Sequence, residues 1–190
     1  MNRRSLFHGI AVVVVIAAAA FVWHHLPVNS RINAPFDVTS NAGSPAAGRN
    51  ITATVLGTQI TPVVEPDNGR PPRLDAAGVW VVVNAAVAAV TEPGLLRVEL
   101  LVGPDTYKPT DRLSATATAG GTMQPLIEYR ANWLFDVAPD ALERVEVVHM
   151  RLWIGDSRLD SRAVIDIPLT GSQVSRPEKV RLALPEVSAS

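Results

Sequence analysis

The chain has 190 residues and a formal net charge of −1, with 17 basic and 18 acidic side chains. This balance provides no basic field and excludes a nucleic acid as the partner. The chain contains no cysteine, which excludes thiol chemistry, disulfide bonds and a lipid-bearing cysteine anchor. Once the terminal segments are set aside, about 120 residues remain, enough for one domain to bury its own core.

The N-terminus carries a basic pair, Arg3 and Arg4, followed by an apolar run at residues 6–23. At about 1.5 Å per residue, a helix over this run is about 27 Å long, close to the ~30 Å hydrocarbon core of a bilayer. The next basic residue, Arg31, lies well beyond the run, so the charge asymmetry predicts a cytoplasmic N-terminus. We therefore expect cytoplasmic residues 1–5 and a transmembrane signal-anchor helix at residues 6–26. The rest of this single-pass cell-membrane protein is then extracytoplasmic.

Two other interpretations of this segment stay open. The three alanines at residues 18–20 form a small-residue site at which a secretory signal peptide is cleaved. Against cleavage, residues 21–23 continue the apolar run past the site without a helix breaker. Residues 3–7 (RRSLF) also loosely resemble a twin-arginine export signal.

Residues 27–50 mix Pro, Asn, Ser and Gly and predict a linker, because this composition cannot bury a core. The triplet at residues 50–52 matches the N-glycosylation pattern, but such triplets are common by chance. Arginine predominates over lysine, and Ala and Val are abundant, which is typical of a GC-rich bacterial genome. In a bacterium the glycosylation triplet has no expected role.

Strand patterns begin at residue 51. The central one is residues 78–90, where both faces are apolar apart from Asn84, which predicts a strand that is covered on both sides. Further strands, most with alternating apolar and polar residues, are expected at residues 51–64, 95–102, 112–118, 129–137, 144–154 and 162–169. About seven strands separated by turns predict an all-β fold, an antiparallel immunoglobulin-like β-sandwich at residues 51–170. Residues 171–190 are expected to form a flexible C-terminal tail, within which residues 180–184 have the composition of one more strand.

Three short motifs resemble those of telokin-like, immunoglobulin-fold domains in bacterial membrane-anchored envelope proteins, a family of unknown function. A valine-rich strand follows a glycine at residues 78–84, and a Tyr-x-Pro element stands at residues 107–109. A phenylalanine-containing strand then runs into a proline at residues 134–139, with one residue, Ala138, more than the family pattern has. The resemblance covers residues 51–169 and implies a sandwich fold outside the cytoplasm. It implies no catalytic residue, because the family is not defined by one.

No set of residues predicts a catalytic, cofactor-binding or metal site. His8, His24 and His25 belong to the N-terminal segment, where two adjacent histidines of a helix diverge by about 100°. The tandem Asp-Ser-Arg triplets at residues 156–158 and 160–162 place an arginine beside each aspartate, which opposes calcium binding. The chain also lacks a Gly-x-Ser-x-Gly elbow, an ordered Ser–His–Asp set and a glycine-rich phosphate loop. We expect a protein that is not an enzyme and binds no cofactor.

One stripe of side chains has two interpretations. Val147, His149, Arg151 and Trp153 share one face of the strand predicted at residues 144–154. This stripe is either the solvent face of an edge strand or a surface that binds a partner.

Taken together, the sequence predicts a membrane-anchored extracytoplasmic β-sandwich that acts as a non-enzymatic interaction or accessory subunit of a cell-envelope complex. Its expected partners are the membrane, through the single N-terminal span, and an envelope protein. The alternative is an extracytoplasmic module that binds a small ligand, a lipid or a glycan. The low aromatic content, 5%, argues against stacking platforms for a glycan.

Overall fold

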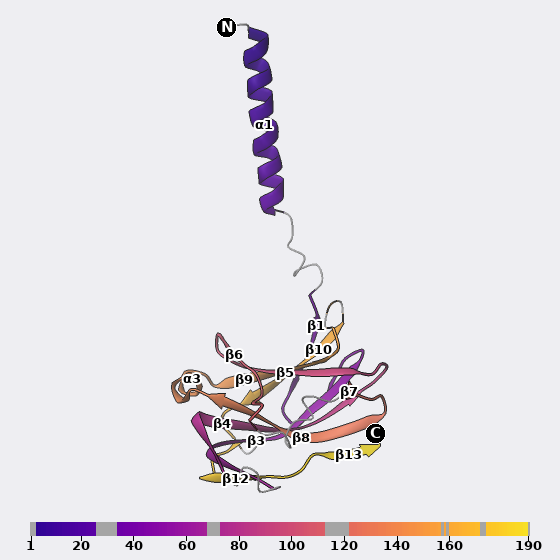
Figure 1. The fold of residues 1–190 in the computed structure, drawn as a ribbon, viewed down its shortest axis with the longest axis vertical. Coiled ribbons are helices and arrows are strands. Elements are labelled where there is room, and N and C mark those ends of the chain that lie inside the picture. Colours follow the sequence, from indigo (N-terminus) through magenta and orange to yellow (C-terminus); the bar gives the residue numbers. More distant parts are fainter. Residues whose placement is uncertain are drawn as a thin grey trace. The chain divides into compact units, whose positions relative to one another are not determined.

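The computed structural model describes residues 3–25, 34–67, 73–112, 122–156, 158, 160–171 and 174–189. The chain divides into two units, residues 1–34 and 35–190. The first unit contains helix α1 (Arg3–His25), in which the rings of Phe21 and His25 stack at a centroid distance of 4.1 Å. In the part of the chain that is described, the second unit contains thirteen strands and one short helix, α3 (Pro139–Glu143) (Figure 1).

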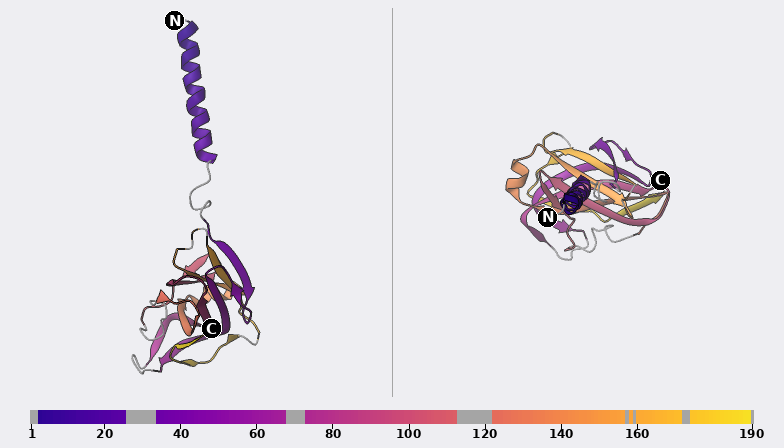
Figure 2. Two further views of the ribbon diagram at one scale, coloured as in Figure 1. Left: turned by 90° about the vertical axis from the view of Figure 1, so that its right-hand side faces the viewer. Right: turned by 90° about the horizontal axis from the view of Figure 1, so that it is seen from above.

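The thirteen strands form two sheets that pack face to face; Figure 2 shows them from two further directions. The six strands of the first sheet are β1 (Phe36–Asn41), β5 (Gly94–Val102), β6 (Asp105–Tyr107), β7 (Thr122–Met123), β9 (Val147–Ile154) and β10 (Ser161–Pro168). Their order is β1-β10-β9-β5-β6, and β7 pairs with the beginning of β5.

The seven strands of the second sheet are β2 (Ala46–Ala47), β3 (Ile51–Pro66), β4 (Leu74–Ala89), β8 (Ile127–Val137), β11 (Val174–Ser175), β12 (Lys179–Leu182) and β13 (Glu186–Ala189). Their order is β11-β3-β4-β8-β13, and β2 and β12 also pair with β3.

The main core lies between the two sheets and follows the two-residue period of the strands. In β9, buried and partly exposed residues alternate over the whole strand. The largest fully buried side chains of this core include Trp133 and Phe135 of β8, which face the inward residues of β5, β9 and β10. Because each such side chain stabilises the fold by about 1.5–3 kcal/mol, the alternation fixes which face of each strand turns inward.

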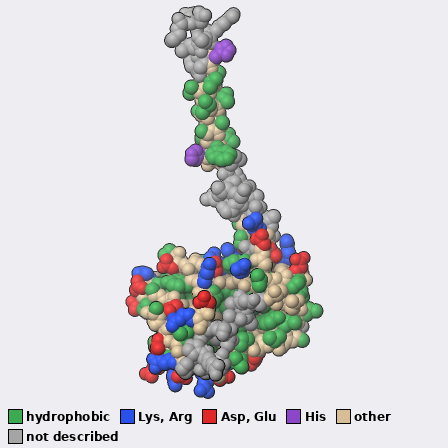
Figure 3. Space-filling view, in the orientation of Figure 1, with side chains coloured by type: hydrophobic (Ala, Val, Ile, Leu, Met, Phe, Trp, Pro, Cys, Tyr) green, Lys and Arg blue, Asp and Glu red, His purple; other side chains and the backbone are tan. Residues whose placement is uncertain are grey.

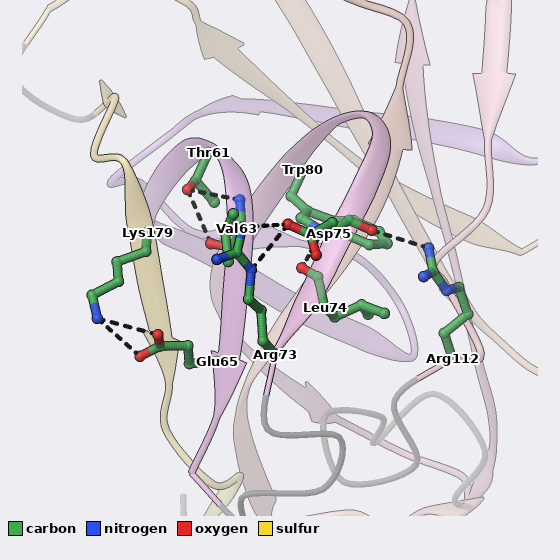
Figure 4. Close-up of polar contacts among 9 residues, drawn as sticks. All are labelled: Thr61, Val63, Glu65, Arg73, Leu74, Asp75, Trp80, Arg112 and Lys179. Atoms are coloured by element: carbon green, nitrogen blue, oxygen red, sulfur yellow. Dashed lines mark hydrogen bonds and ion pairs between the residues drawn. The ribbon is translucent and has the colours of Figure 1, made fainter.

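A second, smaller cluster lies on the outer face of the second sheet. Its buried members are Val64, Leu74, Trp80, Val82, Leu134, Val180 and Leu182. The indole N–H of Trp80 donates to the carbonyl oxygen of Leu74 at 3.2 Å, and the guanidinium of Arg112 lies 5.6 Å from the ring centroid (Figure 4). Strand β4 is therefore covered on both faces, which confirms the interpretation of its two-sided apolar pattern.

The C-terminal strands close this second cluster. Val180 and Leu182 of β12 are 5% and 1% exposed, and Lys179 forms an ion pair with Glu65 of β3 at 3.1 Å (Figure 4). All four residues of β13 are exposed, although the strand pairs with residues 127–130 of β8. The segment predicted as a flexible tail at residues 171–190 thus contains three strands, because its backbone pairs with both margins of the sheet.

An exposed ion pair lies at the beginning of β4. Arg73 Nη2 lies 2.7 Å from Asp75 Oδ1 (Figure 4). The hydrogen bond to Asp75, and then the charge of that carboxylate, raises the pKa of the Arg73 guanidinium above its ordinary value. Both side chains are exposed, so this pair belongs to the solvated rim of the sheet.

The prediction of a transmembrane helix at residues 6–26 is wrong. Within the described residues, no helix combines the length and the apolar character that crossing a membrane requires. His8 and Gly9 interrupt the apolar run of residues 6–23. The uninterrupted apolar stretch is residues 10–23, and its fourteen residues cover only about 21 Å.

The predicted sandwich of about seven antiparallel strands also needs correction. The described residues form thirteen strands, and three of their strand pairings are parallel: β1 with β10, β11 with β3 and β12 with β3. The predicted linker at residues 27–50 contains β1 and β2, which composition misses because they join the sheets mainly through their backbones. The strand predicted at residues 112–118 falls outside the described residues beyond Arg112.

Candidate functional site

The outer face of the first sheet collects the side chains of the predicted stripe. Strand β9 lies between β5 and β10, so the stripe belongs to a central strand and the edge-strand interpretation is wrong. The register of β9 with β5 places Trp153 opposite Arg97, Arg151 opposite Glu99 and His149 opposite Leu101. On the other side of β9, the register with β10 places Arg151 opposite Val164 and His149 opposite Asp166.

An ion pair and a histidine–carboxylate contact cross this face between neighbouring strands. Arg151 Nη2 lies 2.7 Å from Glu99 Oε2, with side chains 21% and 22% exposed. His149 Nδ1 lies 2.7 Å from Asp166 Oδ1. Such cross-strand pairs hold the side chains of the face in defined positions. Figure 3 shows charges of both signs side by side on the visible face of the second unit.

A third pair lies where β10 meets β1. The guanidinium of Arg162 donates to both carboxylate oxygens of Asp37, at 2.8 and 2.9 Å. This two-bond geometry is the strongest form of an arginine–carboxylate contact. It leaves Arg162 compensated, although its position next to the stripe would otherwise make it available to a partner.

A hollow of about 370 Å³ opens beside Trp153. Its lining residues are Leu96, Arg97, Val98, Glu99, Lys108, Pro109 and Trp153. Leu96 and Val98 point into the core, so β5 contributes backbone there, while Trp153, which is partly exposed, and Pro109 contribute apolar surface. The volume lies within the range of roughly 300–1,000 Å³ that is typical of binding sites.

Two cations of this hollow have no partner. The side chains of Arg97 and Lys108 are exposed, and neither forms an ion pair or a hydrogen bond with any residue that the structure describes. The one carboxylate of the lining, Glu99, is engaged by Arg151. The hollow therefore combines a partly exposed indole with two uncompensated positive charges, an arrangement that can hold an anionic group next to an apolar one.

Two smaller hollows, of about 220 and 190 Å³, lie on the outer face of the second sheet and share Leu56 and Asn84. The lining of the smaller one also includes Asn132, whose Oδ1 accepts a hydrogen bond from Asn84 Nδ2 at 2.9 Å. Each is below the usual size of a binding site. The hollow beside Trp153 is the stronger candidate.

The other sequence motifs have structural roles. Asn50 Oδ1 accepts hydrogen bonds from Thr91 N, Thr91 Oγ1 and Glu92 N at 3.0, 2.8 and 2.8 Å, so the amide of the glycosylation-like triplet holds a turn. Asp156 of the first Asp-Ser-Arg triplet lies 3.7 Å from Arg158. No group of three or more His, Cys, Asp or Glu residues that could hold a metal ion occurs among the described residues.

The sequence pointed to only part of this hollow. The sequence predicts Trp153 in a stripe that either faces solvent or binds a partner, and in the strand predicted at residues 95–102 Arg97 occupies a polar position of the alternation. Lys108 and Pro109 were missed as site residues, because they follow β6 in a loop whose position no periodicity specifies. Their only sequence signal is the Tyr-x-Pro element to which they belong.

Comparisons with known proteins add a likeness at the level of structure. No protein-family model and no curated protein matches the chain. The crystal structure of an uncharacterized β-sandwich protein from Clostridium difficile 630 is similar, with 14% sequence identity and a TM-score of 0.43, over 70% of this chain and 93% of that one.

Proposed function

We propose that residues 35–190 form a non-enzymatic interaction domain that works outside the cytoplasm and contacts an envelope protein through the face around Trp153. The observation that carries the proposal is the hollow of about 370 Å³ that Trp153 shares with Arg97 and Lys108, two cations without a partner among the described residues. Tryptophan and arginine are the residue types that most often dominate the energy of protein interfaces. A central strand holds Trp153, so the contact face is built on a rigid element.

The proposed location outside the cytoplasm rests on the N-terminal residues. A basic pair at Arg3 and Arg4, an apolar stretch and the small residues 18–20 follow one another as they do in a cleavable export signal. This interpretation predicts a mature protein that starts shortly after residue 20. The mass of the protein recovered from the producing cell measures the position of the cut.

Membership of the telokin-like, immunoglobulin-fold family is also part of the proposal. Its support is the order of the long strands, β3-β4-β8 in one sheet and β10-β9-β5 in the other. The Tyr-x-Pro element of the resemblance, residues 107–109, contributes Lys108 and Pro109 to the hollow.

Crosslinking in the producing cell tests the proposal. The tagged full chain is expected to capture a reproducible envelope protein, and Trp153→Ala is expected to lose it. Leu184→Ala removes an apolar side chain that is 54% exposed in the connection between β12 and β13, away from the Trp153 hollow, so this control variant is expected to keep the partner. Equal capture by both variants, or no capture above a scrambled domain, contradicts the proposal.

The small-ligand alternative is favoured by the volume of the same hollow, which suits a small molecule. It predicts that a lipid or a glycan copurifies with the wild-type chain and is lost from Trp153→Ala. Native mass spectrometry of the two proteins separates this outcome from protein capture.

A further inference from the structure

We infer that the partner binds the Trp153 hollow through an acidic stretch of polypeptide, whose carboxylates pair with Arg97 and Lys108 while an apolar side chain covers the indole. The inference rests on the proposed function and adds the chemistry of the partner.

Most charges of this face are neutralised internally. Glu99 pairs with Arg151, and Asp37 pairs with Arg162 through two hydrogen bonds. Arg97 and Lys108 remain without a partner among the described residues. Because the whole chain has a formal charge of −1, these two cations are a local feature and do not reflect a basic protein.

The position of Arg97 favours a carboxylate. Arg97 stands directly across from Trp153 on the neighbouring strand, so its guanidinium projects from the same face as the indole. A guanidinium binds a carboxylate through two parallel hydrogen bonds and also lies well against an aromatic ring. An acidic residue followed by an apolar residue in the partner satisfies both groups at once.

The number of cations argues against other anionic partners. Attraction to an anionic membrane surface takes a cluster of about four to eight basic residues, and the hollow has two. A nucleic acid requires an extended basic stripe, whereas this face alternates cations with carboxylates. Two carboxylates within one segment of polypeptide match the number of the free charges.

The mode of contact follows from the position of β9. Its backbone already pairs with β5 and β10 on both sides, so a partner cannot bind here by adding a strand. Recognition must use side chains, which makes it depend on charge and therefore on salt.

The test uses the purified full chain and a fluorescent synthetic peptide of alternating glutamate and leucine, followed by anisotropy. The peptide is expected to bind, and rising NaCl is expected to weaken it. A peptide with glutamine in place of glutamate should bind about tenfold more weakly, the loss expected for two exposed ion pairs. The double variant Arg97→Glu/Lys108→Glu should show a similar or larger loss.

A matched control has the same change of charge elsewhere. Arg176 and Arg181 are exposed near and within β12, and neither has a partner among the described residues. The variant Arg176→Glu/Arg181→Glu is therefore expected to bind the acidic peptide like the wild type. Equal losses in the two double variants, or equal binding of the glutamine peptide, overturn the inference.

Two further experiments distinguish failure of the acidic-peptide inference from failure of the proposed function. Binding of the chain to phosphatidylglycerol vesicles in preference to the acidic peptide would assign the cations to a membrane and overturn the inference. If Trp153→Ala loses the crosslinked partner while the acidic peptide never binds, the proposed function stands and only the partner chemistry is wrong. If Trp153→Ala loses neither partner nor peptide, both fail.

Discussion

Leu126 has a φ of +64°, the one positive value outside glycine in the described part of the chain. Its side chain is 70% exposed, so burial does not compensate the steric conflict between Cβ and the backbone. This left-handed conformation costs an L-residue about 1–2 kcal/mol, and asparagine tolerates it much better. The sharp turn is imposed by the pairing on either side, since Pro125 bridges to Ala89 and Ile127 begins β8.

We therefore expect Leu126→Asn to stabilise the domain by about 1 kcal/mol. Urea unfolding measures the change as a higher midpoint with an unchanged slope. Leu184→Asn is the control, because Leu184 is also an exposed leucine, at 54%, but has no positive φ. An equal gain from both variants would mean that surface polarity, and not backbone strain, is responsible.

Gly78 explains the glycine of one resemblance motif, the valine-rich strand at residues 78–84. A Cβ at this position would collide with the carbonyl oxygen of Val137 on the neighbouring strand. The carboxylate of Asp136 accepts hydrogen bonds from the N–H groups of Ala77 and Gly78, both at 2.9 Å, which holds the two strands this close. A glycine before the valine-rich strand is thus a packing requirement and carries no information about activity.

At the scale of elements, β12 and β13 contribute unequally although they are adjacent in the chain. Leu182 of β12 is 1% exposed and packs in the second cluster with Trp80. In β13 every residue is exposed, and Val187 is 61% exposed. The stability of the C-terminal segment should therefore reside in β12.

We expect Leu182→Ala to lower the free energy of unfolding by about 2–4 kcal/mol, because it removes packing around Trp80. A chain that ends at residue 185 loses the pairing of β13 over four residues. Because all four are exposed at a chain end, water replaces their backbone partners, and we expect the whole loss to be only about 1 kcal/mol. Urea unfolding of the two proteins compares the losses. A truncation as costly as Leu182→Ala would show that β13 is essential to the sheet.

The contrast between strands that bury side chains and strands held mainly by backbone pairing explains how much of the fold the sequence predicts. Strand β4 was predicted because Trp80 and Val82 on one face and Val81 and Val83 on the other are all apolar, and burial on both faces demands that. β1 and β13 were missed, since a strand held mainly by backbone pairing needs no apolar pattern. The stripe that contains Trp153 follows from the same kind of evidence as β4, because the two-residue period of a strand specifies which side chains share a face. It does not specify which loop lies beside that face, so Lys108 was missed.

At the scale of the whole molecule, the second unit begins with a strand that pairs far along the chain. Residues 36–41 of β1 run parallel to residues 161–166 of β10. Phe36 N donates to Asp160 O at 2.9 Å, and Ala42 N donates to Asp166 O at 2.9 Å. Ala46 of β2 is 1% exposed in the main core. The folded unit should therefore include residues 35–50, which composition alone assigns to a linker.

A chain of residues 35–190 is expected to unfold in urea in one transition, with the stability that this unit has in the full chain. A chain of residues 51–190 lacks β1 and β2, and it also loses the two hydrogen bonds between Asp37 and Arg162. Each lost ladder bond costs about 0.5–1.5 kcal/mol, so the shorter chain should be destabilised by several kcal/mol or remain unfolded. Because the slope of the transition scales with the surface that unfolding exposes, the slope should fall as well. Equal midpoints for the two chains would place residues 35–50 outside the cooperative unit, and β1 would then be a strand that docks without supporting the sandwich.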